Sequence, residues 1–145
     1  MNTSIKALFS TRAGYGLTVL RVIVGIIFIA HGSQKLFGAF GGYGLEGTGQ
    51  WMESIGLAPG YLMALLSGSG EFFGGVAVLI GLLARPAAAV LVVLLVVAIF
   101  SVHIGNGLFM SNNGYEFALA LLGGSLAILI EGAGKLSLDR IIASK

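Results

Sequence analysis

The chain has 145 residues, of which 57% are apolar or aromatic and only 10% are charged. Soluble domains are roughly a quarter charged, so eight basic and six acidic side chains cannot cover the surface of a soluble protein of this length. The formal net charge is only +2 and the basic residues are scattered, which excludes a nucleic-acid-binding protein. No cysteine is present, so disulfides and thiol redox chemistry are excluded. The composition indicates a small integral membrane protein.

Four stretches are long and apolar enough to cross a bilayer, which needs roughly 20 residues as a helix. They must be helices, because backbone polar groups cannot stay unpaired in hydrocarbon and the runs lack the alternation of barrel strands. We therefore predict one all-α membrane domain over residues 1–145, a bundle of four transmembrane helices. The predicted spans are residues 17–36, 61–83, 86–102 and 115–130.

The first span follows a leader that contains Lys6 and Arg12 and carries three further polar residues of interest. Arg21 lies one turn into the span, where snorkelling to the inner interface would explain it without a function. His31 and Lys35 lie near the outer end and, at a spacing of four residues, share one helix face. Lys35 either points inward as a partner for a buried carboxylate or anchors the helix at the interface.

The first long loop begins with a glycine-rich segment, residues 38–49. A short amphipathic pattern follows at about residues 48–56, with Thr48 as the candidate N-cap and Trp51 on its apolar face. A short amphipathic helix with a tryptophan is typical of the membrane interface. We expect this helix to lie there or to cover the outer mouth of the bundle.

The second span contains Glu71 about ten residues from its start, near the middle of the membrane. An ionised carboxylate cannot stand alone at this depth, so Glu71 must be protonated or paired with a cation. Gly70 and Gly74 have the spacing of a close helix contact, and small residues in the fourth span add to it. Such contacts indicate one compact bundle, although the same patches could pair two copies.

The third span runs from the turn at Arg85 to His103, which would be an ordinary interfacial histidine if considered alone. Glu116 opens the fourth span. Asn113 and Glu116 have the spacing of a capping box, so Glu116 either starts the helix or serves a site. Basic residues in the leader, the turn at Arg85 and the tail favour cytoplasmic termini, with the two longer loops outside.

The alternating direction of the four spans brings one ionisable residue from each to a similar depth, in the outer half of the membrane. We expect a polar pocket that opens outward. Its ionisable groups would be His31, Glu71, His103 and Glu116, and its candidate walls Phe28, Phe37, Phe72, Phe73 and Tyr115.

Three kinds of chemistry suit such a pocket. Two imidazoles and two carboxylates could bind a transition metal, but the Glu-x-x-His pairs of di-iron bundles are absent, which disfavours a metal. A proton relay would need polar groups in the inner half of the third span, and there are none. A quinone head group, which accepts hydrogen bonds and exchanges protons beside aromatic walls, fits the residue types better.

The sequence contains five motif segments: Leu20-Arg21 with Gly25 and Phe28, the run from His31 to Gly38 with Gly41-Gly42, Glu71-Phe72-Phe73-Gly74-Gly75, Gly81-Leu82-Leu83-Ala84-Arg85 and Asn113-Gly114-Tyr115-Glu116. Taken in this order, they resemble the DoxX family of small bacterial membrane proteins over roughly residues 17–129. The resemblance implies a four-helix protein of the bacterial inner membrane. The family takes its name from a subunit of a thiosulfate:quinone oxidoreductase, and relatives are associated with oxidative-stress complexes and quinone detoxification. The motif positions imply a polar set of Arg21, His31, Lys35, Glu71 and Glu116.

Our leading hypothesis is an inner-membrane component of a redox or quinone-linked system that holds a small hydrophobic ligand in the outward pocket. Glu71 and His31 are the candidate catalytic residues, and Glu71 would exchange the proton. His31 and Lys35 would donate hydrogen bonds, and Glu116 would be a second carboxylate at the mouth. His103 and Arg21 complete the candidate ligand-binding residues. Electrons would come from a redox partner protein or from the ligand. The alternative is a non-enzymatic membrane subunit or assembly factor, alone or as a homo-oligomer, whose polar residues only lock the bundle. A transporter is disfavoured because no span is broken.

Overall fold

The structure is a computed structural model that describes residues 3–11 and 14–145; Arg12 of the predicted basic leader lies outside the described residues. Within these ranges the chain forms helices and loops and no strand, as predicted. The helices are α1 (Thr3–Phe9), α2 (Tyr15–Phe37), η1 (Ala39–Gly41), α3 (Gly44–Ser54), α4 (Gly60–Ile80), α5 (Ala84–Ala98), η2 (Ile99–His103), η3 (Ile104–Asn106), η4 (Met110–Asn112), α6 (Glu116–Glu131) and α7 (Leu138–Ala143).

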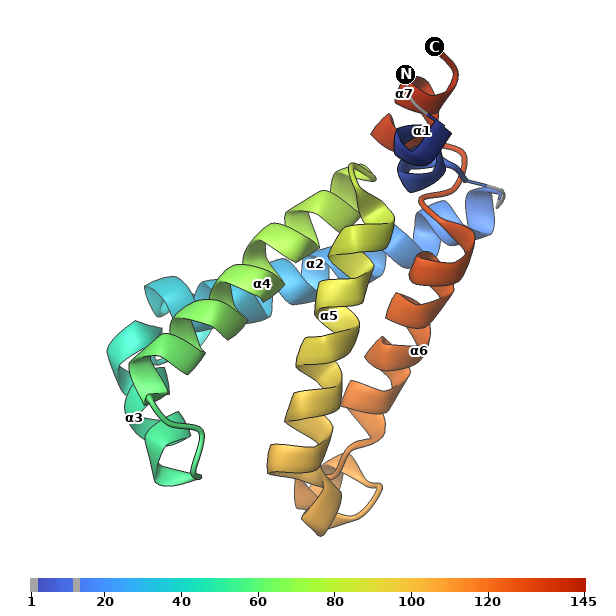
Figure 1. The fold of residues 1–145 in the computed structure, drawn as a ribbon. Coiled ribbons are helices and arrows are strands. Elements are labelled where there is room, and N and C mark those ends of the chain that lie inside the picture. The colour runs from blue at the N-terminus through green and yellow to red at the C-terminus, as the bar shows by residue number, and fades with distance from the viewer. Residues whose placement is uncertain (1–2, 12–13) are drawn as a thin grey trace.

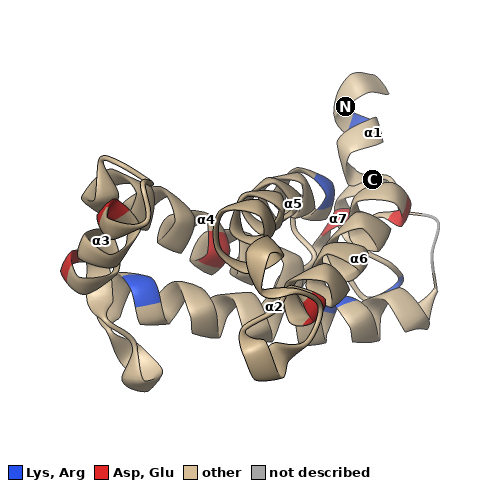
Figure 2. Ribbon diagram, turned by 90° about the horizontal axis from the view of Figure 1, so that it is seen from below, with Lys and Arg blue, Asp and Glu red and all other residues tan. Residues whose placement is uncertain are grey.

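Three helical segments are long and apolar enough to cross a membrane. They are α2, α4 and the continuous segment Ala84–Asn106, which joins α5 to the two short helices that follow it. The stretch predicted as a fourth span is also helical, but α6 has only 16 residues, and at 1.5 Å per residue it is about 24 Å long. Figure 2 shows that charged residues are sparse along these helices, as expected of segments in lipid.

The closest helix pair, α2 and α4, is antiparallel and depends on glycine at the crossing. A Cβ at Gly32 would overlap the backbone of Phe72, and a Cβ at Gly25 would lie 2.9 Å from the carbonyl oxygen of Gly75. Only glycine allows backbones to approach this closely in a membrane. The small residues of the second span therefore do mark helix contacts. Gly70 and Gly74, however, face α5 instead of α2.

The second pair, α5 and α6, lies beside the first (Figure 1). Its contact with α2 and α4 forms the core, in which Val78, Leu91 and Ile128 are fully buried. Toward the end that carries α3, the two pairs spread apart (Figure 1). The candidate site lies at this end.

The helix in the first long loop begins earlier than predicted. α3 starts at Gly44, so the prediction of Thr48 as its N-cap is wrong: Thr48 lies in the second turn and is buried. α3 packs on α4 through glycine, because Gly49 and Gly60 bring the two backbones into contact. The Glu53 carboxylate also accepts a hydrogen bond from the Gly60 N–H, which ties α3 to the start of α4.

Both ends of the chain lie at the end of the molecule opposite α3, where α1 contacts α7 (Figure 1). Lys6 lies on α1, and Lys135, Arg140 and Lys145 lie in and around α7. The two longer loops are at the other end. This is the arrangement that alternating helices require, whichever side of the membrane each end occupies.

Candidate functional site

An ion pair joins α2 to α4 at the end near α3. The Lys35 Nζ lies 2.6 Å from Glu71 Oε1 and 2.5 Å from Oε2, so both carboxylate oxygens accept from one ammonium group. The side chains are only 22% and 13% exposed. The ion pair gives Glu71 the cation that its predicted position in the middle of the membrane requires. Of the two interpretations of Lys35, it supports the one in which the side chain points inward.

Glycine contacts place the two charges together. Gly32 of α2 rests on the backbone of Phe72 in α4. One turn further along α2, the side chains of Lys35 and Leu36 meet the Cβ position of Gly68, which lies on α4. A larger residue at Gly32 would push the helix backbones apart, and one at Gly68 would press on the side chains of Lys35 and Leu36. The Lys35 ammonium therefore reaches Glu71 because the backbones are close.

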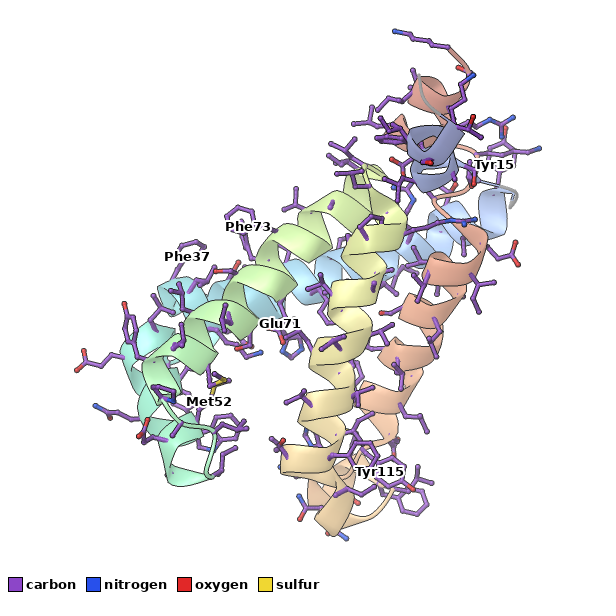
Figure 3. The ribbon with its side chains drawn as sticks, in the orientation of Figure 1. Tyr15, Phe37, Met52, Glu71, Phe73 and Tyr115 are labelled. Carbon is purple, nitrogen blue, oxygen red and sulfur yellow. The ribbon has the colours of Figure 1, made fainter. Side chains whose placement is uncertain are left out.

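Glu71 lines a cavity of about 450 Å³, which we call the apolar cavity. Its walls come from α3, α4, α5 and η2, and its few polar groups include Lys35, Glu71 and His103. In Figure 3, Glu71 and Met52 point toward the space between α4 and α5, whereas Phe37 and Phe73 project from the other side of α2 and α4. The other lining residues are Trp51, Leu57, Met63, Leu66, Ser67, Leu94, Val97, Ala98, Val102 and Asn113.

A second cavity of about 460 Å³, which we call the loop cavity, lies under the glycine-rich segment. It is lined by His31, Gln34, Gly41, Gly42, Tyr43 and Thr48, together with Lys35 and Trp51. Lys35 and Trp51 thus line both cavities. His31 is exposed, and its ring lies 6.1 Å from that of Phe117 on α6.

His103 ends η2, a single turn of π-helix, and such turns are frequent at functional sites. Its Nδ1 lies 2.9 Å from the Asn113 carbonyl oxygen. A carbonyl oxygen only accepts, so this bond places the hydrogen on Nδ1 and leaves Nε2 of the neutral ring as an acceptor. His103 and Asn113 both line the apolar cavity.

Glu116 lines neither cavity. α6 begins at Glu116, with Tyr115 as its N-cap and no capping bond from a side chain, so the predicted capping box is wrong. Asn113 has a left-handed backbone (φ 56°), and the Glu116 carboxylate accepts from the Met110 N–H at 3.0 Å. Glu116 therefore closes the loop that carries Asn113.

Arg21 lies at the opposite end of the molecule from the ion pair and is only 2% exposed. Its guanidinium donates to the carbonyl oxygens of Val78, Leu79 and Leu136, and so binds α2 to the end of α4 and to the C-terminal segment. The nearby Asp139 accepts from the N–H groups of Leu83 and Ala84. Burial raises the pKa of the Asp139 carboxyl, while these two bonds and the charges of Arg21 and Arg85 act in the opposite direction.

The predicted aromatic walls differ from the observed ones. Phe28 is in the core, Phe37 and Phe73 are mostly exposed on the surface, and neither cavity is lined by Phe72 or Tyr115. Trp51 and the methionines of α3 and α4 take their place. The apolar face of the predicted loop helix, which holds Trp51 and Met52, was the sequence signal for this wall, whereas Met63 carried none.

The described part of the chain contains no group of three or more His, Asp or Glu side chains placed to hold a metal ion. His31 and His103 line different cavities. The pocket expected from one ionisable group per helix is thus divided: Glu71 and His103 share the apolar cavity, His31 lines the loop cavity, and Lys35 lies between them.

The fold and this site define a small all-helical membrane protein with a buried ion pair beside a largely apolar cavity. The family model described as DoxX matches residues 16–104, and the chain belongs to the DoxX family.

Bacterial proteins match nearly the whole chain. The chain is 36% identical over 127 residues to "Putative oxidoreductase CatD" of Bacillus subtilis, which covers 88% of this chain and 87% of that protein. It is 34% identical over 136 residues to "Inner membrane protein YqjF" of Escherichia coli, covering 90% and 94%. It is 32% identical over 137 residues to "Uncharacterized membrane protein Rv3486" of Mycobacterium tuberculosis, covering 87% and 80%. No solved structure matches the chain.

Proposed function

We propose that this protein is an inner-membrane component of a redox or quinone-linked system and that it binds a quinone in the apolar cavity. One observation carries the proposal: the Lys35–Glu71 ion pair lines a cavity of about 450 Å³ whose other walls are mostly apolar. Small-molecule sites commonly have about 300–1,000 Å³ and a few polar groups in apolar walls. The name of the Bacillus subtilis relative is consistent with a redox role.

Each polar group has a definite task in this proposal. Lys35 donates a hydrogen bond to a quinone oxygen, and Glu71 supplies or takes the proton that accompanies reduction or oxidation of the ring. His103, with Nδ1 engaged by Asn113, offers Nε2 to a hydroquinone hydroxyl. His31 lines the loop cavity, which Lys35 also lines. The electrons come from a redox partner protein or from the ligand itself.

Glu116 and Arg21 act as positioning residues in the same proposal. Glu116 holds the loop that presents Asn113 to His103. Arg21 fixes the far ends of α2 and α4. Neither lines the apolar cavity, so the contacts within the structure favour these roles over the ligand contact expected from the sequence.

The membrane arrangement is part of the proposal. We propose that α6 is a fourth span, because it packs against α5 and its 16 residues contain no charge between Glu116 and Glu131. The basic residues around α1 and α7 favour the cytoplasmic side for both termini. The two cavities would then face outward, and α3 would lie at the outer interface.

The alternative is a non-enzymatic membrane subunit or assembly factor. It is favoured by the same ion pair and by Arg21, because both sets of bonds join α2 to α4 and would stabilise the bundle without any ligand. In this case the cavity would be filled by lipid or by a partner helix. Each role predicts a different response to the loss of Glu71.

Mass spectrometry of small molecules extracted from gently solubilised protein distinguishes the two roles. The variant Glu71→Gln keeps a polar group beside Lys35 but cannot exchange a proton, and Glu46→Gln removes an exposed carboxylate from α3 as a matched control. We expect quinone in the wild type and in Glu46→Gln and none in Glu71→Gln, with equal expression. A loss of folded Glu71→Gln protein without any quinone in the wild type would favour the structural subunit.

A further inference from the structure

A third cavity lies at the end of the molecule that carries both termini, far from the ion pair. It has a volume of about 490 Å³ and is formed by the C-terminal segment where it turns across the end of the bundle into α7. Lys135 and Arg140 line it together with Leu136, Leu138 and Ile141. The quinone proposal leaves this cavity unexplained.

The cations of this cavity are free to bind an anion. The Arg140 guanidinium is exposed, and within residues 3–11 and 14–145 no side chain or carbonyl group pairs with it. The Lys135 ammonium lies 5.0 Å from the centre of the Tyr15 ring, which holds it at the start of α2 without neutralising it.

The neighbouring acid does not compete for these cations. Asp139 stands between the two in sequence, but it is buried and directs both carboxylate oxygens to the backbone N–H groups of Leu83 and Ala84. Lys6 on α1 and Lys145 at the C-terminus add positive charge to this end. The exposed charge around the cavity is therefore mainly positive.

Exposed apolar side chains accompany the cations. Leu136 is 64% and Ile141 55% exposed, and Ile5 and Leu8 of the adjoining α1 are also exposed. This end of the bundle therefore presents lysine and arginine beside exposed leucine and isoleucine. Such a surface is complementary to a molecule that has an anionic head and apolar tails.

We propose that this cavity binds an anionic phospholipid, with its phosphate at Lys135 and Arg140 and its acyl chains along Leu136 and Ile141. The bound lipid would fix α7 against the end of the bundle. Because α7 carries the Asp139 bonds to the start of α5, occupancy of this site would also stabilise the turn between α4 and α5.

Native mass spectrometry from a neutral detergent tests the proposal, with phosphatidylglycerol and phosphatidylcholine as probes. We expect the wild type to retain phosphatidylglycerol in preference to phosphatidylcholine. The double variant Lys135→Gln/Arg140→Gln should bind phosphatidylglycerol about 30-fold more weakly, since each basic residue near a lipid surface contributes roughly a fivefold effect.

The variant Lys6→Gln is the control for general charge, because Lys6 lies at the same end but does not line the cavity. It should keep nearly all of the preference for phosphatidylglycerol. Equal binding of the two lipids by the wild type, or equal losses in Lys6→Gln and in either single variant of the cavity, would overturn the proposal. Neither result depends on whether the apolar cavity binds a quinone.

Discussion

The Lys35 ammonium contacts both oxygens of the Glu71 carboxylate across the interface of α2 and α4, at 2.6 and 2.5 Å. The two residues are 36 positions apart and meet because Gly32 lets the backbones of α2 and α4 touch, while Gly68 leaves room for the Lys35 side chain. Removing one partner of a largely buried charge pair leaves an uncompensated charge, which destabilises the fold. The pair is therefore a structural contact, and in the function proposed above it also exchanges a proton with the bound quinone.

Removing one partner should destabilise the protein more than removing both. Lys35→Met leaves a carboxylate without its cation and should cost about 3 kcal/mol, because an uncompensated charge remains in a poorly solvated position. The double variant Lys35→Met/Glu71→Leu should recover most of this loss. Thermal midpoints of the purified proteins in detergent measure both effects, and a double variant less stable than Lys35→Met would contradict the pairing.

Enlarging Gly32 should separate α2 from α4. Gly32→Ala places a Cβ within the backbone of Phe72, so the helices must shift and we expect a loss of about 1–3 kcal/mol. Gly123→Ala on α6 is the matched control, since nothing lies within 4 Å of its Cβ position. The control should be neutral or slightly stabilised, as alanine favours a helix over glycine. Equal thermal midpoints for the two variants would refute the close contact.

Asp139→Asn should weaken the junction between the C-terminal segment and the turn before α5. The carboxylate accepts from two backbone N–H groups, of Leu83 and Ala84, whereas an amide offers only one accepting oxygen. The unpaired N–H group should cost about 1–3 kcal/mol. Glu131→Gln changes an exposed carboxylate at the same end and should leave the thermal midpoint unchanged. Proteolysis of α7 in the Asp139 variant provides a second, local readout.

Single cysteines test the membrane arrangement, because the natural chain contains none. Gln50→Cys in α3, Asn112→Cys in η4 and Ser144→Cys near the C-terminus all replace exposed residues. A membrane-impermeant maleimide applied to intact cells stripped of their outer membrane should label the first two, and the third only after permeabilisation. Labelling of Asn112→Cys and Ser144→Cys from the same side would show that α6 does not cross the membrane.

The fold was largely predictable because its main cause is visible in the sequence. Long apolar runs must form helices in lipid, and three of the four runs appear as candidate spans. The contact of Gly32 with Phe72 could not be predicted, since it depends on how α2 and α4 are rotated about their axes. The capping predictions for Thr48 and Asn113 failed because α3 already begins at Gly44, and because the Glu116 carboxylate accepts from the Met110 N–H of the preceding loop instead of forming a capping box.

The site was predictable in its residue types but not in its geometry. Glu71 needed either a proton or a cation as partner. For Lys35 the sequence left two interpretations open, and the one in which it points inward toward a carboxylate supplies this cation. The sequence prediction grouped four residues only by their expected depth in the membrane: His31, Glu71, His103 and Glu116. Because the two helix pairs spread apart, these residues are distributed over two cavities and a loop. Trp51 and Met52 come from a loop helix, whose position over the bundle no periodicity could predict.

The most direct test of the quinone site uses Trp51, the only tryptophan of the chain, which lines the apolar cavity. A quinone bound beside its indole should quench the fluorescence, so titration of the detergent-solubilised protein with a short-chain quinone reports occupancy. N-acetyltryptophanamide in the same detergent corrects for collisional quenching. We predict saturable quenching in the wild type and in Glu46→Gln, and a loss of saturation in Glu71→Gln that is folded by circular dichroism. Quenching that never saturates in the wild type, or that is identical in Glu71→Gln, would contradict a quinone site at the Lys35–Glu71 pair.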